Sequence, residues 1–197
     1  MKKVIDARGE LCPKPVIMTK KELDNLSSGM ITTIVDNEVA KENVTKLAQS
    51  LGLSFTVDKK SDEEYHVEII KGEANNAFQE ETKTKLDKTT IAIGSNKMGQ
   101  GEEELGKILM KSFIYTVSQT EPYPENIVFF NSGVYLTCED SPVLDDLKAL
   151  QEKGVDIQSC GTCLDYYNLK DKLKVGGISN MYSIYEKMKG ANTINIG

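Results

Sequence analysis

The stretch Asp6-Ala7-Arg8-Gly9-Glu10-Leu11-Cys12-Pro13-Lys14-Pro15 decides the fold of the first part of the chain. Val4-Ile5 before it is typical of the end of a strand, and Gly9 allows the chain to turn. Pro13 suits the first position of a helix, because proline lacks the N–H group that has no partner there and its φ is already helical. Pro15 is tolerated within the same turn. The sequence therefore predicts a helix that begins directly after Cys12, with Cys12 as its N-cap.

This position makes Cys12 a candidate reactive thiol. The unsatisfied N–H groups at a helix start carry a partial positive charge, which favours the thiolate, the nucleophilic form of a cysteine. Lys14 and Arg8, the only arginine of the chain, would strengthen this effect if they lie close to the sulfur. The alternative is a small apolar cysteine that fills a corner of the core. The prolines on both sides of Lys14 favour the reactive thiol, because a structural cysteine does not need them.

Composition limits the classes of protein to which the chain can belong. Its 197 residues are 39% apolar, enough for a hydrophobic core, and the length allows one or two domains. The net charge of −6 argues against a nucleic-acid partner, which needs a basic face. No apolar run approaches the roughly 20 residues of a membrane span, and no apolar stretch of signal-peptide length precedes Asp6. We therefore expect a cytoplasmic protein whose four cysteines are reactive or metal-binding rather than a disulfide framework.

The first 73 residues alternate between strand and helix patterns. Residues 30–35 are rich in β-branched side chains and predict a strand. A stripe of apolar residues at helical spacing follows, and it ends at Gly52. Residues 53–57 and 65–69 then alternate as two strands joined by a polar turn. The order β-α-β-α-β-β predicts a two-layer domain over residues 1–73, with its helices on one side of a small mixed sheet.

A change of pattern marks a boundary in the middle of the chain. Residues 74–88 are mostly polar and carry few large apolar side chains, which is typical of a linker. From residue 89 to residue 197, short apolar runs alternate with amphipathic segments. This alternation predicts a second α/β domain with a doubly wound, mostly parallel sheet and helices on both faces.

The second domain contains the other three cysteines. Cys138 and the pair Cys160-x-x-Cys163 fall beside the predicted carboxyl ends of strands, where the sites of open α/β sheets gather. If a helix begins at Cys160, the two thiols of the pair share one face and lie close enough to interact. Three further interpretations stay open from the residues alone: a thiol–disulfide redox protein that uses the pair, a zinc site built from the three cysteines, and an interaction module whose thiols take no part.

The motif Asp6-x-Arg8-Gly9-x-x-Cys12-Pro13-x-Pro15 resembles the CPxP signature of the TusA/SirA-like sulfur-carrier family, over residues 1–73. Residues 89–197 are similar to the DsrE/DsrF-like sulfur-relay fold in their element order and in the stretches Asn131-Ser132-Gly133-Val134 and Gly154-Val155-x-Ile157-x-x-Cys160. The combination of the two domains resembles the YedF-type proteins that are associated with selenium metabolism.

These resemblances imply a sulfurtransferase-like carrier of sulfane sulfur or selenium. Cys12 would hold the cargo as a persulfide or perselenide, supported by Arg8, Gly9, Pro13 and Pro15, and a thiol of the second domain (Cys160, Cys163 or, as a further candidate, Cys138) would act next. The implied partners are a cysteine desulfurase or another persulfide donor, a downstream acceptor protein, and further copies of the chain bound through the second domain. No resident cofactor or metal is expected.

Overall fold

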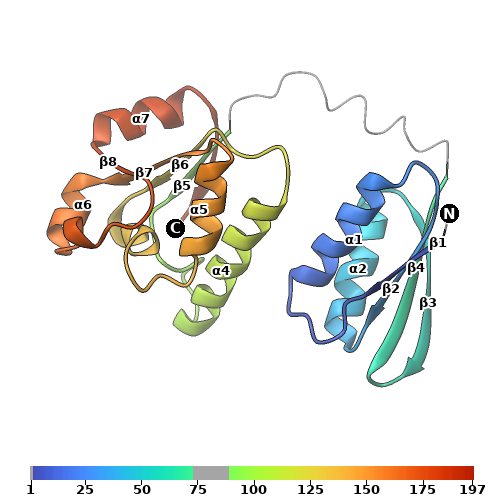
Figure 1. Cartoon of the computed structure of the whole chain (residues 1–197). Coiled ribbons are helices and arrows are strands. Elements are labelled where there is room, and N and C mark those ends of the chain that lie inside the picture. The colour runs from blue at the N-terminus through green and yellow to red at the C-terminus, as the bar shows by residue number, and fades with distance from the viewer. Residues whose placement is uncertain (1, 73–88) are drawn as a thin grey trace. The chain divides into compact units, whose positions relative to one another are not determined.

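The computed structural model describes residues 2–72 and 89–197. These residues form two compact units, one on each side of the segment between them (Figure 1). The predicted linker, residues 74–88, lies outside the described residues. Within the described ranges, no helix combines the length and the apolar character that crossing a membrane requires.

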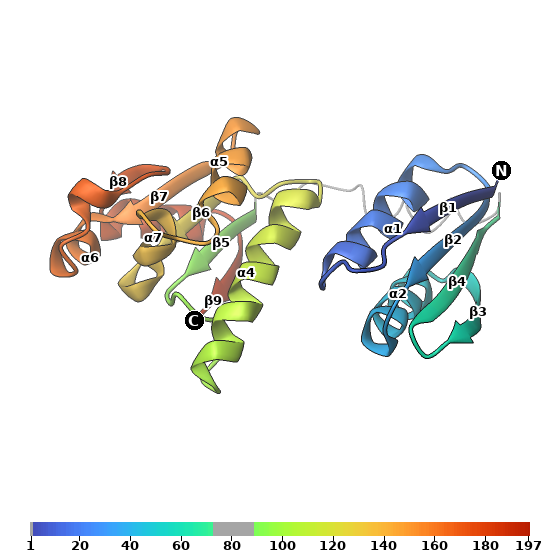
Figure 2. The ribbon, with the colours of Figure 1, turned by 60° about the horizontal axis from the view of Figure 1, so that its bottom comes forward.

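The N-terminal unit has the predicted order of elements and the predicted two layers. Its elements are β1 (Lys2–Asp6), α1 (Lys14–Asn25), β2 (Gly29–Val35), α2 (Glu38–Ser50), β3 (Ser54–Ser61) and β4 (Glu64–Lys71). The sheet order is β1-β2-β4-β3, in which β1 and β2 are parallel and the other neighbours antiparallel. Figure 2 shows α1 and α2 on the same side of this sheet.

Alternation along the strands explains this packing. In β4, Val67 and Ile69 are completely buried, whereas His66 and Glu68, which precede them, are half-buried, as expected when one face of a sheet is covered. The buried face packs against Val44 and other residues of the apolar stripe of α2. The core of this unit therefore lies between the sheet and the two helices, and the segments that lead into α1 and α2 meet at one end of it.

The C-terminal unit contains a five-stranded sheet in the order β8-β7-β6-β5-β9, and all its neighbouring strands are parallel. Its elements are β5 (Thr89–Ile93), α4 (Glu103–Gln119), β6 (Asn126–Phe129), the 3₁₀ helix η2 (Asn131–Thr137), α5 (Leu144–Glu152), β7 (Asp156–Cys160), α6 (Gly161–Tyr166), the 3₁₀ helix η3 (Lys170–Lys172), β8 (Gly177–Ser179), α7 (Met181–Lys189) and β9 (Asn192–Ile196).

Helices cover both faces of this sheet, as the sequence predicts for a doubly wound domain (Figure 1). The larger core includes Met110 of α4 and Leu147 of α5. A smaller core on the other face joins Ile184 of α7 to Val128 and Cys160 of the sheet. Because β6 and β7 are parallel and in register, the segments that follow them lie side by side.

Candidate functional site

A network of carboxylates fixes the loop between β1 and α1. The Arg8 guanidinium donates from Nε and Nη2 to the two carboxylate oxygens of Asp6, at 2.9 and 2.6 Å, and it lies 3.6 Å from the Glu64 carboxylate. These hydrogen bonds from Arg8 lower the pKa of Asp6 to about 2. Gly9 has a φ of +75°, in the region that favours glycine, and its N–H donates to Asp36 Oδ2 at 2.6 Å. That hydrogen bond is the main reason why the pKa of Asp36 is lowered. The loop is therefore held to the segment between β2 and α2.

The prediction that Cys12 is the N-cap of the following helix is wrong by one residue. The first residue of α1 is Lys14, and its N-cap is Pro13. The Lys14 N–H donates to the Leu11 carbonyl at 2.9 Å, so that residues 11–14 form a turn before the regular helix. The first helical hydrogen bond runs from the Ile17 N–H to the Pro13 carbonyl, at 3.1 Å. Cys12 lies in this turn and is exposed to solvent.

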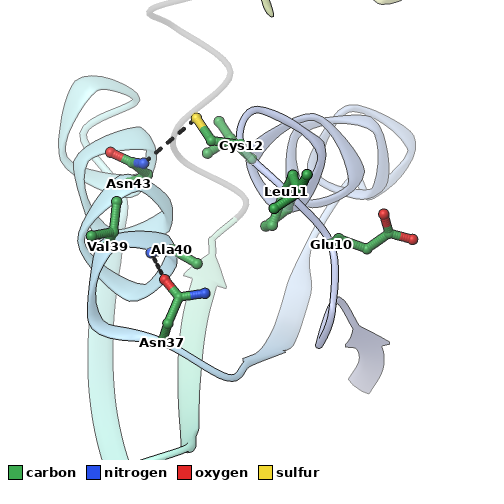
Figure 3. A pocket seen from close by; sticks show the side chains of 9 residues that line it. Glu10, Leu11, Cys12, Asn37, Val39, Ala40 and Asn43 are labelled. Atoms are coloured by element: carbon green, nitrogen blue, oxygen red, sulfur yellow. Dashed lines mark hydrogen bonds between the residues drawn. The ribbon is translucent and has the colours of Figure 1, made fainter. Parts of the chain in front are cut away.

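The hydrogen-bond donor beside the Cys12 sulfur comes from another helix. Pro13, the N-cap of α1, and Pro15, the second residue of the helix, have no N–H, which leaves few backbone donors there. Instead, Asn43 Nδ2 in α2 donates to Cys12 Sγ at 3.8 Å (Figure 3). Sequence reasoning missed Asn43. The sequence offers one signal for it: Asn43 directly precedes Val44, a buried residue on the inward face of α2.

An apolar pocket of about 230 Å³ opens beside the Cys12 thiol (Figure 3). It lies between the turn before α1 and the first turns of α2, and its lining residues are Glu10, Leu11, Cys12, Pro15, Val16, Asn37, Val39, Ala40 and Asn43. Two of them are large apolar side chains at the surface: Leu11 is 82% exposed and Val39 is 64% exposed. The thiol therefore lies beside apolar surface that another protein can cover.

The cations near the motif have carboxylate partners. Arg8 pairs with Asp6 and Glu64 as described above, and the Lys14 ammonium lies 3.0 Å from the Glu10 carboxylate. No contact between Arg8 and Cys12 is found in the described residues. The ion pairs of Arg8 with Asp6 and Glu64 hold the shape of the loop, and support of Cys12 by Arg8 stays a prediction. Gly9 supplies the turn, Pro13 caps α1, and Pro15 lines the pocket.

The structure separates the two thiols of the Cys160-x-x-Cys163 pair by burial. Cys160 is the last residue of β7 and the N-cap of α6, and it is only 2% exposed. Cys163 lies in the first turn of α6 and is partly exposed. Its Sγ accepts a hydrogen bond from the Asn131 N–H at 3.1 Å. Burial, and next the hydrogen bond with Cys160, raise the pKa of Cys163, although the Asn131 N–H acts in the opposite direction.

Cys138, the further candidate thiol, lies in the core of this unit. It follows η2 rather than a strand, it is completely buried, and its Sγ donates to the Val134 carbonyl at 3.2 Å. Burial raises the pKa of Cys138, so that its thiolate is disfavoured. Within residues 2–72 and 89–197, no group of three or more His, Cys, Asp or Glu side chains is placed to hold a metal ion. The zinc site considered from the sequence is therefore not supported.

Comparison with known proteins identifies the N-terminal unit. The family model described as "Sulfurtransferase TusA" matches residues 3–71. A Methanocaldococcus jannaschii protein that is provisionally named a sulfur carrier is 33% identical over 70 residues, which are 35% of this chain and 93% of that protein. An Archaeoglobus fulgidus protein with the same provisional name is 34% identical over 70 residues, 34% of this chain and 80% of that protein.

Among solved structures, the SirA-like protein of Desulfitobacterium hafniense is 36% identical and covers 36% of this chain and 97% of its own, with a TM-score of 0.35. The family match includes the whole loop from Asp6 to Pro15, with Cys12 at its exposed turn. Through its N-terminal unit, the chain belongs to the TusA family.

Proposed function

We propose that this protein is a sulfur carrier and that Cys12 holds the cargo as a persulfide. The observation that carries the proposal is the exposed Cys12 thiol of a TusA-family unit, which lies at the edge of an apolar pocket and accepts a hydrogen bond from Asn43. A carrier thiol must be reachable by large partners, and it reacts as a thiolate. Exposure meets the first requirement, and the Asn43 amide, which favours a negatively charged acceptor, supports the second.

The loading step is an exchange between thiolate and persulfide. The Cys12 thiolate attacks the outer sulfur of a persulfide on the donor, for which a cysteine desulfurase or another persulfide-bearing protein is suitable. A new S–S bond forms at Cys12, the S–S bond of the donor breaks, and the donor sulfur leaves as a thiolate with the bonding electron pair. The same exchange accepts selenium in place of the outer sulfur. Delivery to an acceptor protein repeats the step with the roles reversed.

We extend the proposal to the rest of the chain. The C-terminal unit, proposed here as a DsrE-like domain, takes the cargo onto one thiol of the Cys160-x-x-Cys163 pair. This unit also supplies contacts between copies of the chain. The observation in favour is the exposed apolar stripe of α4, formed by Leu105, Ile108 and Leu109 at helical spacing. The free thiols fit the reducing conditions of the cytoplasm.

Transfer of labelled sulfur tests the carrier function. The full chain, its Cys12→Ser variant and its Cys138→Ser variant are each incubated with a cysteine desulfurase and radiolabelled cysteine, then separated without reductant. We expect label on the full chain and on Cys138→Ser, and its removal by dithiothreitol. To exclude label on the C-terminal pair, the role of Cys12 is read in chains that also carry Cys160→Ser and Cys163→Ser. In this background we expect label when Cys12 is present and none when it is replaced by serine. Equal label with and without Cys12 would refute the proposal. A parallel reaction with selenocysteine distinguishes sulfur from selenium as cargo.

A further inference from the structure

We propose that Cys160 and Cys163 form a persulfide-reducing pair, in which Cys163 accepts a sulfane sulfur and Cys160 expels it as hydrosulfide. This inference depends on the proposed function only for the cargo, a persulfide sulfur. The chemistry is assigned by the geometry of the C-terminal unit itself. It gives the chain an activity beyond carriage: release of the sulfur in its reduced form.

Burial determines which thiol can accept sulfur from a partner. Cys160 is 2% exposed and packs with Ala92, Val128 and Ile184 in the small core under α7. Cys163 is partly exposed and lies at the edge of that core. A persulfide carried by a protein or by a peptide thiol can therefore reach Cys163 but not Cys160. An outer sulfur on Cys160 would also have to fit inside a packed core, which overpacks it.

The two thiols belong to one small core. Cys160 is one of its buried residues, and Cys163 packs against it. Cys160 ends β7 and Cys163 lies in the first turn of α6, so that the two residues are on consecutive, directly joined elements. Side chains three residues apart at the start of a helix share one face, which places the two sulfur atoms within reach of each other.

A fixed donor faces the accepting sulfur. The Asn131 N–H donates to Cys163 Sγ at 3.1 Å, and Asn131 has a φ of +49°, outside the usual range for a residue with a side chain. Tyr167, on the turn after α6, holds this conformation, because its hydroxyl donates to Asn131 Oδ1 at 2.9 Å. Burial raises the pKa of Cys163, and the Asn131 N–H group acts against this effect because it favours negative charge on the sulfur that attacks the incoming persulfide.

The reaction balances without a further reagent. The Cys163 thiolate first attacks the outer sulfur of the donor persulfide and becomes a persulfide, while the donor leaves as a thiolate. The Cys160 sulfur then attacks Cys163 Sγ and gives its proton to solvent. A disulfide forms between the two residues, the bond from Cys163 Sγ to the outer sulfur breaks, and the outer sulfur leaves with the electron pair as hydrosulfide. The sulfane sulfur is reduced and the two thiols are oxidised.

The test uses the full chain with Cys12→Ser, which removes the N-terminal thiol, and glutathione persulfide as the sulfur source, because this donor leaves as glutathione thiolate and not as hydrosulfide. This Cys12→Ser chain is the parent. Hydrosulfide release and the masses of non-reduced peptides are measured for the parent and for three variants of it, which carry Cys160→Ser, Cys163→Ser or both. We expect the parent to release one hydrosulfide per chain above the doubly substituted background and to lose two hydrogen atoms at the peptide that contains the pair. The Cys160→Ser variant should release none and retain one added sulfur atom on Cys163.

Two results would overturn the inference: release by the Cys160→Ser variant equal to that of the parent, or an added sulfur on Cys160 in the Cys163→Ser variant. Cys160→Ala repeats the test without a hydroxyl group in the core, in case the serine variant does not fold. Cys138→Ser is the matched control, a buried thiol outside the pair, and should change neither readout. Loading of Cys12 is measured separately on the chain with Cys160→Ser and Cys163→Ser, so that failure of the pair and failure of the carrier function are distinguishable.

Discussion

The contact between Asn43 and Cys12 allows a sharp test of how the thiol is activated. Asn43 Nδ2 donates to Cys12 Sγ from a different helix, and the neighbouring prolines leave few backbone donors in its place. Asn43→Ala removes this hydrogen bond together with one side chain of the pocket lining, and leaves the loop and the Cys12 backbone in place. We expect the variant to react more slowly with alkylating reagents at neutral pH, because the attacking sulfur loses a hydrogen-bond donor that favours negative charge.

The size of the effect follows from the strength of the bond. A hydrogen bond in a protein contributes about 0.5 to 1.5 kcal/mol net, which corresponds to about a twofold to tenfold slower reaction when it stabilises only the reactive form. Asn43→Asp should slow the reaction further. Two unit charges about 4 Å apart repel by about 1 kcal/mol in water, which adds a factor of about five.

The assay is the rate of iodoacetamide labelling at Cys12, read from its peptide by mass spectrometry. Gln49→Ala is the matched control, because Gln49 is another amide of α2, is exposed, and does not line the pocket. The reasoning would be refuted if Asn43→Ala and Gln49→Ala labelled at the same rate, or if Asn43→Asp reacted faster than the unsubstituted chain.

Three further predictions concern the loops that hold the two sites. Gly9→Ala should lower the free energy of unfolding of the N-terminal unit by about 1 kcal/mol, measured by urea unfolding. An added Cβ meets no atom within 4 Å, so that the cost comes from the positive φ alone. Gly72→Ala is the control: an added Cβ there also meets no atom within 4 Å, the φ is not positive, and stability should change little. Gly133→Ala should cost more, at least about 2 kcal/mol, because its Cβ would lie 2.3 Å from the Ile93 carbonyl oxygen; an unchanged thermal midpoint would contradict this. The pKa of Asp36 is lowered in the folded chain, so that the contribution of Asp36 to stability is present above the unfolded pKa near 4 and is lost as the pH falls through the lowered value. Asp36→Asn should remove this part of the acid dependence of stability. An unaltered pH profile of stability would contradict the prediction.

The sequence predicts the fold well where periodicity is regular. In β4, buried Val67 and Ile69 alternate with half-buried neighbours, and this pattern alone places the helices on one face of the N-terminal sheet. The short apolar runs of the second unit likewise predict a parallel sheet covered on both faces, as found. Such patterns are local, and each strand or helix carries its own.

The candidate sites were harder to predict, because their contacts are tertiary. Asn43 is 31 residues from Cys12 along the chain, and no local pattern connects the two. The cap of α1 was misplaced because the Leu11 carbonyl accepts the Lys14 N–H in a turn before the helix. In the Cys160-x-x-Cys163 pair, the motif does not say which thiol faces solvent. The packing of Ile184 from α7 buries Cys160, and that packing depends on a helix about 20 residues later in the chain.

The most direct test of the central claim is the mass of the Cys12 peptide after sulfur transfer. The full chain with Cys160→Ser and Cys163→Ser, which cannot pass the cargo to the pair, is incubated with a cysteine desulfurase and unlabelled cysteine. Free thiols are then blocked, and the protein is digested without reductant. The account predicts one additional sulfur atom on the peptide that contains Cys12, removed by dithiothreitol. If that peptide keeps its unmodified mass while another cysteine gains sulfur, Cys12 is not the carrier and the account is wrong.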